Sequence, residues 1–213
     1  GSIYPLAQLY YLRTHLIAQL CVQIGKRFIH QEYGVRQLLV EHTHFNDPEK
    51  REHIRRLLIR AAQQKTIPIV NYNDPVSDEE NRKMELAIRR SHGDQVVECV
   101  DNDETAAVIA NLVHAKKLVL MTSTEGIYRD PADPKTLVEQ VTAKSMEELE
   151  GKVRQLQESC VGASRAGANG AKAKLEYALK SARQGTMVII GHARHRLSDL
   201  VEGRVACTRI GLE

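Results

Sequence analysis

Residues 118–126, with the sequence Leu-Val-Leu-Met-Thr-Ser-Thr-Glu-Gly, pass directly from four apolar residues to a polar run. Polar residues likewise follow the apolar run at 67–70 and the strand expected at 95–100. Short apolar runs without strict alternation are typical of strands that are covered on both faces. Segments with helical periodicity separate these runs. Helices that alternate with buried strands predict an α/β fold with a largely parallel sheet between helix layers.

The other expected elements follow from apolar periodicity and from turn signals. In chain order, all of them are a long helix or two short ones over 6–30, a strand at 35–40, a helix from Pro48, a strand at 67–70, a charged helical insertion from 77 to about 90, a strand at 95–100, a helix at 106–113, a strand at 118–121, helices at 146–159 and 171–183, and a strand at 187–190.

The length of 213 residues agrees with one domain, or with one domain and an appendage, and we expect a single domain over residues 1–213. The chain begins with Gly1-Ser2 instead of Met and enters an apolar-periodic run almost at once. We therefore expect a further segment upstream, so that the domain is incomplete at its N-terminus.

The composition is that of an ordinary globular protein, with 42% apolar and 27% charged residues. These values disfavour a disordered chain and a disulfide scaffold. The net charge of +3 comes from 30 basic residues mixed with 27 acidic ones, and the chain holds two Phe and no Trp. The sequence thus has no basic block and is poor in the aromatic residues on which bases stack, and we expect no nucleic-acid partner.

The four cysteines, at positions 21, 99, 160 and 207, are far apart and form no Cys-x-x-Cys motif. They indicate neither a zinc site nor a redox pair, and we expect buried thiols in a reducing cytosol. No stretch approaches the roughly 18 consecutive apolar residues that a membrane helix needs, and no signal segment is recognised. We expect a cytoplasmic protein without a membrane partner.

Polar clusters follow three of the expected strands: Asn73-Asp74, Asp101-Asn102-Asp103 and Thr122-Ser123. Ligands of open parallel sheets bind beyond the carboxyl ends of the strands, where these clusters converge. A single Asp or Asn at a strand end is more often a turn or helix-capping residue than a ligand. Three such clusters together favour a binding site.

A second feature is the run at 162–174, Gly-Ala-Ser-Arg-Ala-Gly-Ala-Asn-Gly-Ala-Lys-Ala-Lys, which leads straight into an expected helix. Glycines permit close approach of the backbone, the helix N-terminus offers free N–H groups, and Lys174 could reach a phosphate oxygen. The run is not a Walker A loop, because no Gly-Lys-Ser/Thr occurs. It can equally be read as a flexible connector.

The histidines give weaker signals. His42 and His44, two apart at an expected strand end, could ligate a metal, but no further ligand falls at suitable spacing, and we assign no metal site. His192 and His195 lie in a basic stretch with Arg194, which favours a solvated rim over a catalytic group. No nucleophile motif of the Gly-x-Ser-x-Gly type is present.

Taken in order, three elements resemble the amino acid kinase family, and within it most closely the glutamate 5-kinases. They are Ile69-Val70-Asn71-Tyr72-Asn73-Asp74, then Val100-Asp101-Asn102-Asp103-Glu104, then residues 118–122 with Glu125-Gly126-Ile127-Tyr128 and Asp130-Pro131. The run from Gly167 to Lys174 resembles that family's glycine-and-lysine nucleotide loop. The resemblance covers residues from about 33 to 210 and implies a three-layer αβα sandwich with a mostly parallel central sheet.

The resemblance implies a cytoplasmic, homo-oligomeric kinase that transfers the ATP γ-phosphoryl group to the side-chain carboxylate of glutamate, the first step of proline biosynthesis. Asp103 and Lys174 would be catalytic, Asp103 by orienting the lysines and Lys174 by contacting the transferring phosphoryl group together with Mg²⁺. The amino acid would be held by Asp74, Asn102 and Asn73. The nucleotide would be held by Thr122, Ser123, Gly167, Ala168, Asn169, Gly170, Lys172 and Lys174.

The sequence also departs from the family pattern. Ser123 stands where glutamate 5-kinases usually have Asp, and Ala168-Asn169 replaces a usual Thr-Gly pair. The family's first strand, with its phosphate-binding lysine, is not found in this sequence. Two alternatives therefore stay open: a non-catalytic relative that binds a nucleotide or an amino acid, and a kinase of this fold that acts on another acceptor, such as a nucleoside monophosphate or carbamate.

Overall fold

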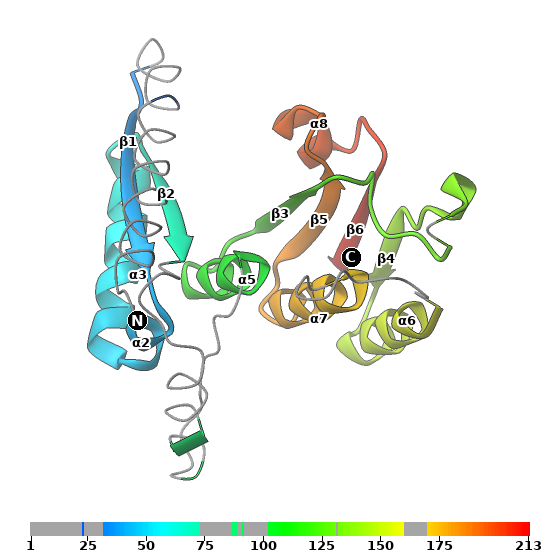
Figure 1. Cartoon of the computed structure of the whole chain (residues 1–213), viewed down its shortest axis with the longest axis horizontal. Helices are drawn as coiled ribbons and strands as arrows, with labels where there is room; N and C mark the ends of the chain where they lie inside the picture. The colour runs from blue at the N-terminus through cyan, green and yellow to red at the C-terminus, as the bar shows by residue number, and fades with distance from the viewer. Residues whose placement is uncertain are drawn as a thin grey trace, which may run out of the picture. The chain divides into compact units, whose positions relative to one another are not determined.

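The structure is a computed structural model that describes residues 23, 32–72, 87–88, 91, 102–130, 132–159 and 170–213. The chain divides into two compact units, residues 1–102 and 103–213, each with its own sheet among the described residues (Figure 1). Within the described residues, no helix combines the length and the apolar character needed to cross a membrane.

The first unit contains a parallel βαβ arrangement. Strand β1 (Gly34–Val40) pairs with β2 (Thr66–Tyr72), and helices α2 (His42–Asn46) and α3 (Pro48–Gln63) connect them. Asp47 caps α3, because its Oδ1 accepts hydrogen bonds from the N–H groups of Glu49 and Lys50. The strands expected at 35–40 and 67–70 and the helix expected from Pro48 are confirmed.

The second unit holds a four-stranded sheet in the order β3-β5-β6-β4. Strands β3 and β5 pair in parallel, as do β4 and β6, whereas β5 and β6 are antiparallel. Its elements in chain order are α5 (Asn102–Leu112), which begins at the last residue of the first unit, β3 (Lys117–Thr122), the 3₁₀ turn η3 (Pro134–Thr136), β4 (Gln140–Ala143), α6 (Met146–Ser159), α7 (Ala171–Ala182), β5 (Met187–His192), α8 (Leu197–Glu202) and β6 (Cys207–Leu212).

Helices cover both faces of this sheet, and strand β5 shows why. Val188 and Ile190 point to one face and join the main core with α6 and α7. Ile189, between them, points to the other face and packs against Leu200 of α8. A strand that is buried on both faces typically has a continuous run of apolar residues, and residues 187–190 of β5 form such a run. The predicted α/β fold with mostly parallel strands is confirmed, and within this unit the layers are α, β and α.

Helix α2 of the first unit and strands β4 and β6 and helix α8 of the second were not expected. Strands β4 and β6 complete the sheet of the second unit, and the short helix α8 covers one of its faces. The placement of His42 and His44 at a strand end is wrong, because β1 ends at Val40 and both histidines lie in α2. There the Nδ1 of His44 accepts a hydrogen bond from the Glu41 N–H (2.9 Å), so this ring serves the start of the helix.

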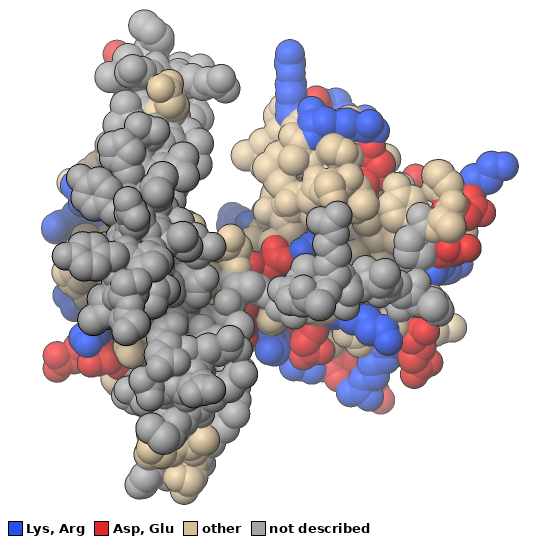
Figure 2. Space-filling view, in the orientation of Figure 1, with Lys and Arg blue, Asp and Glu red and all other residues tan. Residues whose placement is uncertain are grey.

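Some expectations fall on residues that the structure does not describe. These are the strand at 95–100, all but one residue of the helical run at 6–30, and all but two residues of the insertion at 77–90. Among the described residues, Cys207 is a buried free thiol, as expected. On the face drawn in Figure 2, basic and acidic side chains of the second unit are interspersed, in keeping with the small net charge.

Candidate functional site

The N-termini of helices α5 and α7 are joined by an ion pair between Lys174 and Asp103. Asp103 lies in the first turn of α5, and Lys174 lies in the first turn of α7, whose N-cap is Gly170. The side chain of Lys174 is 22% exposed and that of Asp103 is 27% exposed, so water reaches the pair only in part. The structure therefore brings together the two residues predicted to be catalytic.

The position of Lys174 is unfavourable by helix electrostatics alone. The N-terminus of a helix carries partial positive charge and favours acidic side chains. Helix α5 follows this rule with Asp103 and Glu104, but the first turn of α7 has no acidic residue and carries Lys172 and Lys174. Sites where a sequence breaks a local rule are often functional. Two ammonium groups and a helix N-terminus together suit an anionic ligand such as a phosphate group.

A second group of residues lies where strands β3 and β5 end side by side. Thr122, the last residue of β3, is paired with His192, the last residue of β5. The Thr122 carbonyl accepts a hydrogen bond from Ala193 N–H (2.8 Å), and its hydroxyl Oγ1 accepts one from Thr124 N–H (3.0 Å). Ser123 is exposed in this turn. The strand ends thus present a structured polar loop, as the position of ligands in parallel sheets leads one to expect.

Glu125, in the same loop, binds two residues that follow β5. Its Oε1 accepts a hydrogen bond from Arg194, and its Oε2 lies 2.6 Å from His195 Nε2. The prediction of a solvated rim fits Arg194, whose side chain is 62% exposed, but not His195, which is 20% exposed and paired. The sequence offered no local signal for this contact, because the partners are 70 positions apart.

The remaining predicted site residues are distributed as follows. Gly170 caps α7, and the Lys172 carbonyl accepts a hydrogen bond from Gln157 Nε2 (3.1 Å). Asn102 is the exposed first residue of α5 and belongs to the first unit.

Two separate groups of contacts are present among the described residues. One joins Asp103 to Lys174, and the other joins Glu125 to the residues after β5; the hydrogen bonds and ion pairs of the described residues do not connect the two groups. Outside the described residues lie Asn73, Asp74, Gly167, Ala168 and Asn169.

The described residues contain no group of three His, Cys, Asp or Glu side chains that could hold a metal ion. Mg²⁺ does not require such a group, because it keeps several waters and is often held by substrate phosphates with one or two carboxylates. Asp103 is one carboxylate of the candidate site that could contribute to such binding.

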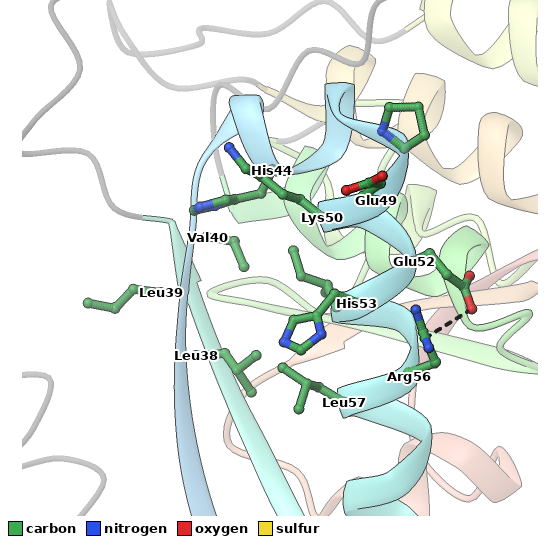
Figure 3. Close-up of a pocket in the computed structure, with 12 residues that line it drawn as sticks. Leu38, Leu39, Val40, His44, Glu49, Lys50, Glu52, His53, Arg56 and Leu57 are labelled. Atoms are coloured by element: carbon green, nitrogen blue, oxygen red, sulfur yellow. Dashed lines mark ion pairs between the residues drawn. The ribbon is translucent and has the colours of Figure 1, made fainter.

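A separate groove lies in the first unit, between β1 and α3, with a volume of about 930 Å³ (Figure 3). Apolar side chains such as Leu38 and Leu57 line it, with Glu52 and Arg56 at its border. Arg55 donates two hydrogen bonds to Glu52 (2.7 and 2.8 Å), which lowers the pKa of Glu52. The residues that line the groove include none of those predicted for substrate or nucleotide.

The sequence is similar to sequences of known proteins. The sequence model of the amino acid kinase family matches residues 14–192. A glutamate 5-kinase of Geobacillus thermodenitrificans is 26% identical over 205 residues, with 91% of this chain and 50% of the relative covered. A delta-1-pyrroline-5-carboxylate synthase of Mesembryanthemum crystallinum is 27% identical over 175 residues, with coverages of 81% and 22%. The chain thus spans half or less of the length of these relatives.

Among solved structures, the carbamate kinase of Giardia lamblia bound to AMP-PNP is similar in fold. The two structures superimpose with a TM-score of 0.50 at 14% sequence identity. The superposition covers 75% of this chain and 44% of the carbamate kinase chain. At this identity the similarity concerns the fold alone.

Proposed function

The chain belongs to the amino acid kinase family, and we propose that it transfers the terminal phosphoryl group of ATP to the side-chain carboxylate of glutamate or of a related small acid. The observation that carries this proposal is the ion pair between Lys174 and Asp103 at the start of α7. The relatives named glutamate 5-kinase, at 26–28% identity, support glutamate as the acceptor.

The proposed reaction needs little covalent help from the protein. The acceptor carboxylate is already ionised at neutral pH, so no general base is required. Phosphoryl transfer is catalysed mainly by positioning and by positive charge around the phosphoryl oxygens. Lys174 would supply such a charge, and Asp103 would hold its ammonium group in place. When bound with the nucleotide, Mg²⁺ would neutralise further phosphate charge.

The other residues divide between the two substrates. We assign the nucleotide to the α7 N-terminus and the β3 end, where Gly170, Lys172 and the Thr122-Ser123 turn supply N–H groups, cations and hydroxyls. The residues assigned to the nucleotide further include Gly167, Ala168 and Asn169. The amino acid is assigned to Asn73, Asp74 and Asn102. In this proposal the protein is a cytoplasmic homo-oligomer that catalyses the first step of proline biosynthesis.

A non-catalytic relative is the second candidate, and a specific observation favours it. Ser123 is an exposed serine where glutamate 5-kinases usually have an acidic residue. Such a protein would still bind ATP or an amino acid through the same loops, and it would serve as a regulatory or assembly subunit.

The test measures ADP release by the purified protein with glutamate, aspartate, carbamate and a nucleoside monophosphate as separate acceptors. Hydroxylamine traps any acyl phosphate as a hydroxamate. We expect ADP and hydroxamate with glutamate. ADP release only with carbamate or the nucleoside monophosphate would assign another acceptor. ATP binding in a calorimeter without turnover on any acceptor would favour the non-catalytic relative.

A further inference from the structure

The loop after β3 is anchored to the sheet at both of its ends. At one end, Thr122 is paired with the last residue of β5 and its hydroxyl closes a turn onto Thr124. At the other end, the Ile127 N–H donates a hydrogen bond to the buried Thr208 hydroxyl (2.8 Å). Residues 123–126 lie between these anchors. Thr124 makes hydrogen bonds within this loop, and Glu125 adds contacts to residues outside it.

Glu125 ties this section to the loop that follows β5. Its carboxylate has one partner on each oxygen, Arg194 on Oε1 and His195 on Oε2. Both partners belong to the loop that follows the neighbouring strand, and not to the loop of Glu125 itself. A contact between the ends of two adjacent parallel strands fixes one loop relative to the other.

The two partners differ in how firmly they can hold the carboxylate. The Arg194 side chain is 62% exposed, and ion pairs of exposed side chains contribute little because water and salt screen them. Glu125 and His195 are 17% and 20% exposed and lie 2.6 Å apart, and a hydrogen bond to an ionised carboxylate is stronger than one between neutral groups. The pair Glu125–His195 is thus the firmer of the two contacts.

We propose that Glu125 and His195 are positioning residues that hold the Thr122–Glu125 turn in the conformation that binds an adenine nucleotide. The inference rests on the proposed function, because it assumes that ATP binds at the end of β3. A loop fixed before binding loses less conformational entropy when it closes on a ligand, so preorganisation strengthens binding. Neither residue needs to touch the nucleotide; they act through Thr122 and Ser123.

The test compares ATP affinity, measured by calorimetry, in the variants Glu125→Ala, His195→Ala and their combination. We expect each single change to weaken ATP binding about tenfold, and the double variant to be no weaker than either single one, because contacting residues are coupled. His195→Gln retains an N–H donor and should stay within about threefold of the wild type. Hydrogen exchange of the peptide that spans 119–127 should be faster in Glu125→Ala.

The control is Arg204→Gln, which removes the exposed ion pairs of Arg204 with Asp199 and Glu202 without touching the β3 loop. It should leave ATP affinity unchanged. Wild-type protein that fails to bind ATP would overturn the proposed function and this inference together. Wild-type protein that binds ATP, with unchanged affinity in Glu125→Ala and His195→Ala or with additive losses in the double variant, would overturn this inference alone.

Discussion

Lys174 donates a hydrogen bond to Asp103 across 71 positions of sequence and joins the first turns of two helices. The contact sets the ammonium group of α7 against the carboxylate of α5. A carboxylate suits a helix N-terminus, whereas an ammonium group opposes the helix dipole there. The contribution of the ion pair to folding stability is thus partly offset by the unfavourable position of Lys174 at a helix N-terminus. This offset favours a role of the pair in ligand binding over a role in stability.

Lys174→Ala should abolish most ATP turnover and leave the fold intact. Loss of a cation at the phosphoryl group costs on the order of 10³-fold in rate in comparable reactions. The free energy of unfolding should change by no more than about 1 kcal/mol, because the ion pair is partly exposed. ADP release and thermal unfolding measure the two effects. The matched control is Lys180→Ala in the last turn of α7, which should behave as the wild type in ADP release.

Asp103→Asn should separate catalysis from helix stability. Asp103 lies inside the first turn of α5, after Asn102, so the change removes one carboxylate that favours the helix N-terminus, a loss of about 0.3–1 kcal/mol, and the melting temperature should fall only slightly. The amide cannot offset the charge of Lys174, and we expect the rate to fall about a hundredfold, as on loss of one preorganised charge contact. Near-normal turnover at saturating ATP and glutamate would remove Asp103 from the catalytic machinery.

Elements with strong local signals could be predicted from the sequence, and those defined by distant pairing could not. Helix α6 begins and ends where expected, since its apolar residues Leu149, Val153 and Leu156 share one face. Strand β4 has four residues and too short a pattern to recognise. Strand β6 mixes polar and small residues, and its place in the sheet depends on pairing with β5, in which Val188 lies opposite Ile210.

The candidate site shows the same division. Asp103 and Lys174 stand in motifs that resemble a known family, so their roles could be predicted, and the structure places them in contact. Glu125 was part of such a motif, but its partner His195 lay in a stretch that looked like a solvated rim. No periodicity links two loops 70 positions apart, and only the parallel pairing of β3 and β5 brings them together.

The start of helix α6 should lose stability in acid through Glu148. A hydrogen bond from Lys152 is the main cause that lowers the pKa of the Glu148 carboxyl, and the backbone N–H of Lys144 adds to it. A carboxyl with a lowered pKa in the folded state stabilises it above the ordinary value of 4.5, and the contribution disappears as pH falls through the folded-state pKa.

Glu148→Gln should therefore reduce stability slightly at pH 7 and have little effect near pH 3. Urea unfolding of both proteins at the two pH values measures the difference. An equal loss at both values would show that the charge of Glu148 does not contribute and that the contact acts through shape or neutral hydrogen bonding.

Two glycines of the second unit should respond to alanine in opposite directions. At Gly126 a Cβ atom would lie 2.9 Å from the backbone nitrogen of Thr208, closer than real Cβ contacts permit, and β6 cannot yield easily. It would also crowd the Thr208 hydroxyl that binds Ile127 N–H. Overpacking of this kind costs about 1–3 kcal/mol, and the lost hydrogen bond adds about 1 kcal/mol.

Gly151 lies in the interior of α6, and a Cβ there would meet no atom within 4 Å. Because glycine weakens a helix interior, Gly151→Ala should raise the free energy of unfolding by about 0.5–1 kcal/mol. Denaturant unfolding of the two variants beside the wild type measures both effects. A Gly126→Ala protein as stable as the wild type would mean that the loop after β3 can move away from Thr208, and that its anchoring at Ile127 is weaker than the contact indicates.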